Sequence, residues 1–221
     1  MGLMVTRLLR LAVVIAAALS VTVTSHAAAG VEVVSVRLPF AGASDPSCFD
    51  LDWDGRQEVL VSGAGGEVAA FASDGLKRLW LTRVSDKSMT PVVAGDFAGA
   101  GAPMVAVASS DGSVYFLDGT TGGVLASASV GVPVILAPTV VPLGPLDGTD
   151  REGVVVCDDR GGVHLVTFGG SDARVVFHVP NTVETPDGGG TRRVALGRVT
   201  RPASVGDVTG NGVPEILVGT V

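Results

Sequence analysis

One segment occurs four times in the chain, and this repeat constrains the fold more than any other feature of the sequence. Each copy is a polar, glycine-bearing loop that runs directly into an apolar stretch, and the copies align without gaps as 49–61, 95–107, 144–156 and 206–218. The leading loop positions are 50, 96, 145 and 207, so the copies are 46, 49 and 62 residues apart. Periods of this size are typical of arrays in which small units stack and cover one another's apolar faces.

Each unit is predicted to hold four short antiparallel strands. Turns rich in glycine lead from the repeated segment to a second apolar stretch (65–71, 111–117, 160–166) and then to a third (76–82, 124–130, 174–179). Four strands in such a period indicate a blade of a β-propeller. We therefore predict an all-β propeller of four-stranded antiparallel blades with units that begin near 46, 91, 138 and 202. Three blades would be complete and a fourth partial, so that the ring is incomplete.

Two segments fall outside these units. Val31–Leu38 is strand-like, and we expect it to be an outer blade strand. Residues 181–201 are an insertion in the third unit that carries four arginines, Arg192, Arg193, Arg198 and Arg201. Insertions on a rigid scaffold are common positions for binding loops, and a tolerated surface insertion is the alternative.

Residues 1–29 have the layout of a secretory signal peptide. They contain no Asp or Glu, include Arg7 and Arg10, and continue as an apolar stretch over 11–23 that is followed by small residues. We expect residues 30–221 to be the propeller segment of a secreted or cell-surface protein, or of a periplasmic one in a bacterium. An uncleaved signal anchor, or an anchor on a longer parent chain, is the alternative route to a membrane.

The amino-acid composition argues against certain ligands and secondary structures. The chain has 15 Lys and Arg against 22 Asp and Glu, a formal net charge of −7, which argues against nucleic acid as a ligand. Its 31 Gly disfavour long helices. Cys48 and Cys157 are far apart in the sequence, and they form either one disulfide or two buried thiols.

Parts of the chain resemble the repeats of two known families. Residues 202–219 (PASVGDVTGNGVPEILVG) and 49–62 resemble FG-GAP or VCBS repeats, the blades of integrin α-type propellers, and the likeness extends in degenerate form over 46–221. It implies a secreted or cell-surface adhesion, protein-binding or scaffold module with calcium in its blade loops, and a protein or glycan ligand. Residues 112–125 resemble the blade turn of PQQ-like quinoproteins, which implies either a quinone-dependent dehydrogenase or a periplasmic assembly scaffold.

The first loop has the residues of a calcium site. Asp50, Asp52 and Asp54 alternate before Gly55, and Glu58 follows on the next strand. Four carboxylates around one turn suit a hard cation with oxygen ligands, to which the backbone carbonyl of Arg56 would add. An acidic turn held by its own hydrogen bonds is the alternative.

The other three loops are less suited to a metal. In the fourth loop the corresponding residues are Asp207, Thr209, Asn211 and Glu215, so we expect a weaker calcium site there. In the second loop only Asp96 remains, because alanines take the other ligand positions, and we expect no metal. The third loop begins with Pro145, and we interpret Asp147, Asp150 and Glu152 as a charged turn.

Evidence for catalysis in the sequence is weak. The nucleophile motif G-x-S-x-G is absent. His164 and His178 are expected to be neighbours across a hairpin, which leaves a metal site incomplete. Trp80 is expected in the core and Trp53 at an exposed contact surface. We therefore expect a binding module rather than an enzyme, with PQQ-dependent activity as the alternative.

Overall fold

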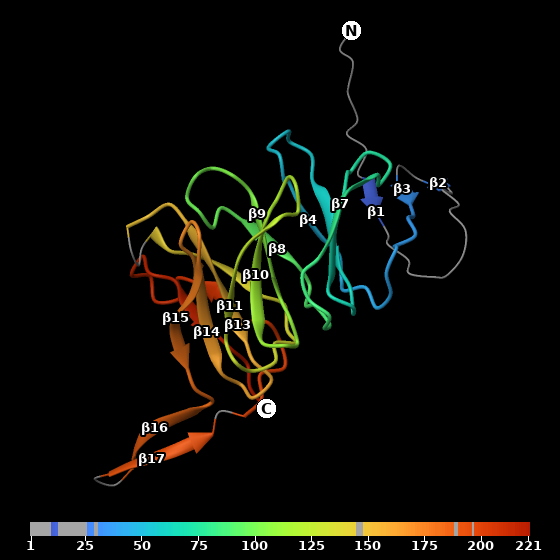
Figure 1. The fold of residues 1–221 in the computed structure, drawn as a ribbon. Helices are drawn as coiled ribbons and strands as arrows, with labels where there is room; N and C mark the ends of the chain where they lie inside the picture. Colours follow the sequence, from blue (N-terminus) through green and yellow to red (C-terminus); the bar gives the residue numbers. More distant parts are fainter. Residues whose placement is uncertain (1–9, 13–25, 29–30, 145–147, 188–189, 196) are drawn as a thin grey trace.

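A computed structural model describes residues 10–12, 26–28, 31–144, 148–187, 190–195 and 197–221, and the elements within them are β-strands (Figure 1). Three four-stranded antiparallel sheets make up most of the structure, and their strands follow one another in chain order from β4 to β15. We number these sheets and a two-stranded fourth as blades I to IV. They confirm the predicted all-β propeller architecture, with three complete blades and two strands of another.

The strand bounds repeat from blade to blade. Blade I consists of β4 (Ser47–Phe49), β5 (Glu58–Ser62), β6 (Glu67–Phe71) and β7 (Arg78–Arg83). Blade II consists of β8 (Val93–Gly95), β9 (Met104–Ala108), β10 (Ser113–Asp118) and β11 (Val124–Ser129). Blade III consists of β12 (Thr139–Pro142), β13 (Glu152–Cys157), β14 (Val163–Phe168) and β15 (Ala173–Val179), and blade IV of β18 (Ser204–Gly206) and β19 (Glu215–Leu217).

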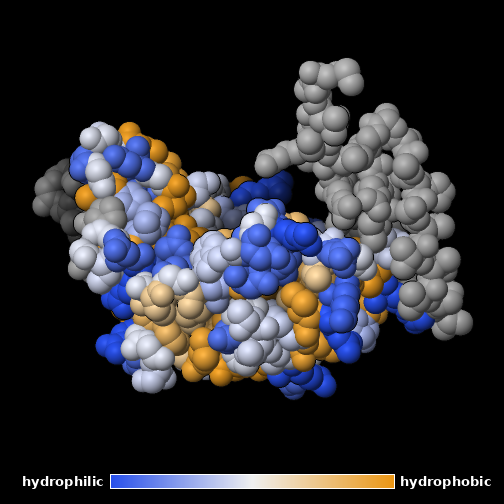
Figure 2. Space-filling model, turned by 90° about the horizontal axis from the view of Figure 1, so that it is seen from above, coloured by the Kyte–Doolittle hydropathy of each residue, from blue (hydrophilic) through white to orange (hydrophobic). Residues whose placement is uncertain are grey.

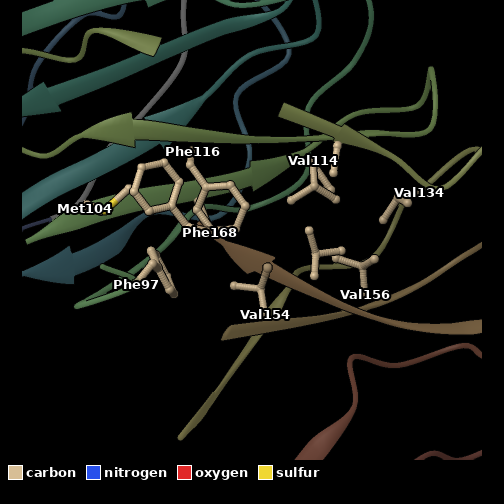
Figure 3. Close-up of a cluster of buried hydrophobic side chains, with 12 residues drawn as sticks. Phe97, Met104, Val114, Phe116, Val134, Val154, Val156 and Phe168 are labelled. Atoms are coloured by element: carbon tan, nitrogen blue, oxygen red, sulfur yellow. The ribbon is translucent and has the colours of Figure 1, made fainter. Parts of the chain in front are cut away.

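Most of the core lies between adjacent blades. The central strands of each complete blade are largely buried on both faces, as at Leu60 and Val61 of β5, so they form continuous apolar runs in the sequence. Blades II and III share a cluster in which the Phe116 ring lies 5.2 Å from Phe97 and 5.8 Å from Phe168 (Figure 3). Burying side chains of this size stabilises the fold by about 1.5–3 kcal/mol each. The blades are therefore held in place by their neighbours.

The prediction of an outer blade strand at Val31–Leu38 is wrong. Among the strands that the structure describes, β3 (Val31–Val34) pairs with β1 (Arg10–Ala12) and β2 (His26–Ala28) and with no strand of a blade. The chain after β3 instead lies across an apolar face of blade I, where Leu38 is buried in one cluster with Phe71 and Leu76. The apolar character of this segment thus reflects the need to cover that face.

The insertion in the third unit contains a two-stranded antiparallel hairpin. Its strands, β16 (Thr182–Asp187) and β17 (Gly190–Ala195), pair only with each other among the described strands. The hairpin projects away from the blades (Figure 1). Arg198 and Arg201 of the predicted basic patch are exposed, whereas the side chains of Arg192 and Arg193 lie outside the described part of the chain.

Each complete blade has a β-bulge at the same position of its outermost strand. The register between the third and fourth strands shifts by one residue, which leaves Leu79, Leu125 and Val176 without a direct partner. These three large apolar side chains are 51%, 43% and 51% exposed. They are among the apolar residues that reach the protein surface, on which Figure 2 shows orange patches among polar residues.

A glycine with positive φ lies near the end of the turn from the second to the third strand in every complete blade. The residues are Gly66, Gly112 and Gly161, with φ of 89°, 87° and 94°. A Cβ at any of them would collide with the backbone of the segment that leads away from the blade's outer strand, such as Val132 beside Gly112. Only glycine allows this backbone contact, which explains why it recurs in the sequence.

The two cysteines do not form a disulfide. Cys48 on β4 is exposed and Cys157 on β13 is buried, so the buried-thiol interpretation holds for Cys157 alone. Burial raises the pKa of the Cys157 thiol to about 11. Within the described residues, no helix has the length and apolar character needed to cross a bilayer.

Candidate functional site

The loop that follows the first strand of each blade carries most of the residues singled out from the sequence. In the first loop, Asp50 Oδ1 and Oδ2 accept hydrogen bonds from the backbone N–H groups of Asp54 and Gly55 at 3.1 and 2.9 Å. Asp52 Oδ1 accepts a bond from Asp54 N–H, and Asp54 Oδ1 one from Arg56 N–H. These bonds fold the loop into consecutive turns around its own carboxylates.

Three carboxylates of the first loop converge. Asp50, Asp52 and Glu58 each have an oxygen within 4.8 Å of the others, whereas Asp54 is not part of this group. Burial raises the pKa of Glu58, and the carboxylates of Asp52 and Asp54 raise it further, although a hydrogen bond from Leu51 N–H opposes them. The buried Glu58 carboxylate thus stands beside other acidic groups, which is a favourable environment for a cation.

The fourth loop has a hydrogen-bond pattern similar to that of the first loop but carries fewer charged side chains. Asp207 accepts bonds from the N–H groups of Gly210, Asn211 and Gly212. Glu215 accepts bonds from Val208 N–H and from the Thr209 hydroxyl. Backbone N–H groups lower the pKa of Asp207, and the Thr209 hydroxyl lowers that of Glu215. These carboxylates are satisfied by the loop itself.

The third loop has a different length and register from those that the gapless alignment predicts. Pro142 pairs with Glu152, as Phe49 pairs with Glu58 in blade I, so the loop begins at Leu143 and is one residue longer than the first loop. Glu152 therefore occupies the place of Glu58, and interpreting it as part of a charged turn was wrong. Its side chain reaches into blade II, where Oε2 accepts a hydrogen bond of 2.8 Å from Asp96 N–H.

The second loop is organised around Asp96. Its carboxylate accepts hydrogen bonds from Ala100 N–H at 3.0 Å and Gly101 N–H at 2.7 Å. Its backbone carbonyl accepts a bond from Glu152 N–H at 3.0 Å. Asp96 thus orders its own loop and joins blade II to blade III. Of the remaining third-loop residues, Asp150 is exposed and Asp147 lies outside the described residues.

The first three loops surround a cavity of about 430 Å³ where the innermost strands of blades I, II and III approach one another. Phe49 and Trp53 of blade I and Asp96 of blade II contribute to its wall. Blade III contributes three charged residues, Asp150, Arg151 and Glu152. The cavity combines aromatic and charged groups from three blades, which is typical of a binding site.

Trp53 is held in an uncommon conformation at the rim of this cavity. Its φ is 59°, a region in which a bulky residue is rarely found. The indole N–H donates a hydrogen bond of 2.9 Å to the carbonyl of Gly101 in blade II, and the ring packs edge-on against Phe49 with centroids 5.9 Å apart. The side chain nevertheless stays 55% exposed, as expected from the sequence, whereas Trp80 is buried. Contacts across two blades thus hold an aromatic surface open to solvent.

Blade III also contains a buried acid–histidine pair. His164 Nε2 lies 2.8 Å from Asp158 Oδ2, and its ring stacks on that of His178 at 4.5 Å, which confirms that the two histidines are cross-strand neighbours. Burial alone would raise the pKa of Asp158, but hydrogen bonds from His164 and from two backbone N–H groups outweigh it and leave the pKa lowered. The pair sits beneath β15, and its residues do not line the cavity.

Sequence reasoning singled out Trp53 and the acids of the first loop but missed the cavity. The sequence pattern predicts that Asp96 stands alone in a loop without a metal, and it gives no indication of Arg151. A signal was present, because Glu152 lies shortly before a run of valines, as Glu58 and Glu215 lie directly before apolar runs. The extra residue in the third loop concealed this correspondence.

Comparison with known proteins gives no family. No protein-family model matches the chain, and no curated protein matches it either. Among solved structures, BamB from Moraxella catarrhalis matches 65% of the chain at 17% identity with a TM-score of 0.44, and a chain of the mitotic checkpoint complex matches 62% at 10% identity with the same TM-score. The matches cover 40% and 47% of those two chains, so this protein spans less than half the length of each of the two.

Proposed function

We propose that this protein is a β-propeller binding module that recognises a protein partner through the face formed by its first-strand loops. The observation that carries the proposal is the cavity between blades I, II and III, with the exposed side chain of Trp53 at its rim. Large aromatic side chains on an ordered surface are the residues that most often dominate binding energy at protein interfaces.

The scaffold beneath this face supports such a role. The cavity wall includes Phe49 at the end of β4, Ala94 on β8 and Pro142 at the end of β12, and the sheets behind them are packed on shared apolar clusters. A rigid scaffold lowers the entropy lost on binding, since the loops are already ordered. The role we propose is therefore binding, as an adhesion or scaffold module, and quinone-dependent catalysis is the alternative. Export by the N-terminal segment would place the protein outside the cytoplasm.

We further propose that Ca²⁺ stabilises the first loop. Asp50, Asp52 and Glu58 fit a calcium ion, because their oxygens converge and oxygen is the ligand that Ca²⁺ prefers. Asp54 and the carbonyl of Arg56 would add to the set after a small rearrangement. In the fourth loop, Asp207, Thr209, Asn211 and Glu215 would form a weaker site with only two charged ligands. A bound ion would stiffen the loop that presents Trp53.

The binding role is tested with three forms of the full chain. Wild type, Trp53→Ala and Leu79→Ala are immobilised, and proteins from the native compartment that each retains are identified. Leu79 is exposed on the outer strand of blade I, so its substitution controls for the loss of an apolar surface side chain. We expect at least one protein to be retained by wild type and Leu79→Ala but not by Trp53→Ala. If no retained protein depends on Trp53, this face is not the binding surface.

A further inference from the structure

Acidic residues outnumber basic ones in the lining of the cavity. The residues that line it include three acids, Asp96, Asp150 and Glu152, and one base, Arg151. Arg151 Nη1 donates a hydrogen bond of 3.2 Å to the carbonyl of Phe168, so this cation is partly directed toward its own blade. A ligand in the cavity would therefore meet a negative potential, which the formal charge of −7 on the whole chain reinforces.

The hydrogen-bond donors to the cavity carboxylates do not neutralise their negative charge. Both oxygens of Asp96 accept bonds from backbone N–H groups, and so does Oε2 of Glu152. Such donors hold a carboxylate in position without neutralising it, and each oxygen keeps a lone pair for a further donor. Asp150 is exposed beside them. The acids are therefore arranged in advance for a cationic donor.

The aromatic part of the wall suits the same ligand. The indole N–H of Trp53 is already bonded to Gly101, so the ring offers its face rather than its polar edge. The face of an indole attracts cations more strongly than that of any other aromatic side chain, and the interaction contributes about 0.5–2 kcal/mol. Phe49, Ala94 and Pro142 supply apolar surface beside it, against which an aliphatic stem can lie.

We propose that this cavity binds the side chain of a lysine or arginine presented by the protein partner. Its aliphatic stem lies on the apolar wall, its cationic group faces the indole of Trp53, and Asp150, Asp96 and Glu152 accept its hydrogen bonds. This proposal rests on the binding function proposed above and specifies the chemistry that the face recognises.

A titration with short peptides tests the proposal. The ligands are acetyl-Gly-Lys-Gly-amide and acetyl-Gly-Arg-Gly-amide, and the control is the lysine peptide with its ε-amine acetylated. Because Trp80 is buried, a change in tryptophan emission and in its quenching by iodide reports mainly on Trp53. We expect both cationic peptides to bind, the acetylated peptide to bind at least about tenfold more weakly, and the affinity to fall as salt is raised.

Variants locate the binding site. The Trp53 variants lose the fluorescent reporter, so peptide binding to all variants is measured by isothermal titration calorimetry. Trp53→Ala should weaken binding by about 2- to 30-fold, which corresponds to the cation–π range above, and Trp53→Phe should retain part of the affinity. Asp150→Asn should weaken binding as well, whereas Asp86→Asn removes the same charge from an exposed position outside the cavity and should leave the affinity unchanged. Asp150 is exposed, so this variant is expected to fold.

Three results would overturn the proposal. Equal binding of the acetylated and free lysine peptides would show that charge is not recognised, and equal losses with Asp150→Asn and Asp86→Asn would show that the effect is not local. A protein partner that depends on Trp53 but is indifferent to salt and competes with a neutral oligosaccharide would also exclude a cationic side chain. The last result would leave the binding function intact, so the two proposals fail separately.

Discussion

The carboxylate of Glu152 in blade III accepts a hydrogen bond of 2.8 Å from the backbone N–H of Asp96 in blade II. Glu152 N–H returns a bond of 3.0 Å to the Asp96 carbonyl, so the two residues form a reciprocal pair across the blade boundary. Gly95 lies beside them, and a Cβ at this position would collide with Glu152 Oε2 and displace the carboxylate. One side chain thus fixes the position of two loops that border the cavity.

Replacing Glu152 with alanine is expected to destabilise the protein. The substitution leaves Asp96 N–H without its acceptor, which costs about 1–3 kcal/mol for a buried donor and less where water can replace it. Chemical denaturation measures the loss, and the exposed Asp150→Ala is the control, with an expected change within about 0.5 kcal/mol. Gly95→Ala should destabilise wild type but have little further effect in Glu152→Ala, since the colliding side chain is then gone. Additive effects of the two substitutions would contradict this coupling.

Gly112→Ala is expected to be far more destabilising than Gly101→Ala. Both glycines have positive φ, 87° and 69°, so both substitutions cost about 1 kcal/mol in backbone strain. A Cβ at 112 would also lie 2.9 Å from the backbone N and O of Val132, whereas one at 101 meets no atom within 4 Å. We expect the free energies of unfolding to differ by at least about 2 kcal/mol, and similar values would argue against close backbone packing at this turn.

Calcium is expected to raise the melting temperature of the protein through the first loop. An ion that binds only the folded state adds about 2.7 kcal/mol at a hundredfold excess over its Kd. Asp52→Asn should remove most of the calcium-dependent shift, because it replaces one charged ligand without changing the shape of the side chain. Asp96→Asn is the matched control and should keep the shift, and Asp207→Asn should reduce it slightly if the fourth loop binds weakly. A melting curve that chelator leaves unmoved would exclude the metal.

The buried pair of Asp158 and His164 is expected to make the free energy of unfolding depend on pH in the acidic range. The pKa of Asp158 is lower in the folded protein than its ordinary value of 3.8, so the folded state favours the ionised form. The stability from this group is complete above pH 3.8 and is lost as the pH falls through the lower, folded pKa. Asp158→Asn should therefore have a lower free energy of unfolding near neutral pH and a shallower loss below pH 4 than wild type, measured by urea denaturation. Parallel pH profiles would contradict the assignment.

The two thiols are expected to differ in reactivity. Cys48 is exposed, whereas Cys157 is buried and its pKa of about 11 keeps it protonated at neutral pH. A thiol reagent should therefore modify one cysteine rapidly in the native protein and the second only after unfolding. Cys48→Ser should abolish the fast phase. Fast modification of both thiols would show that the core between blades III and IV is open.

Local patterns predicted the strands well because each is a short apolar run between glycine turns. Because β5, β9 and β13 are buried on both faces, each is a largely continuous apolar run in the sequence. Gly66 and Gly112 mark the turns that follow β5 and β9. The pairing register of the third loop was not predictable in this way. Leu143 is buried although it belongs to the loop, so a gapless alignment placed the start of the loop two residues too late. The cavity was missed because contacts between blades, such as that of Trp53 with Gly101, have no local signature.

The bulges at Leu79, Leu125 and Val176 also limit how many strands a blade can have. An outermost strand with regular pairing would offer a straight row of N–H and C=O groups to another chain, and such edges are templates for aggregation. A bulge displaces one residue from that row and increases the local twist, so a fifth strand cannot stay in register along its length. Because the same position is bulged in all three complete blades, the rim of the propeller resists edge-to-edge growth even though it carries exposed apolar side chains.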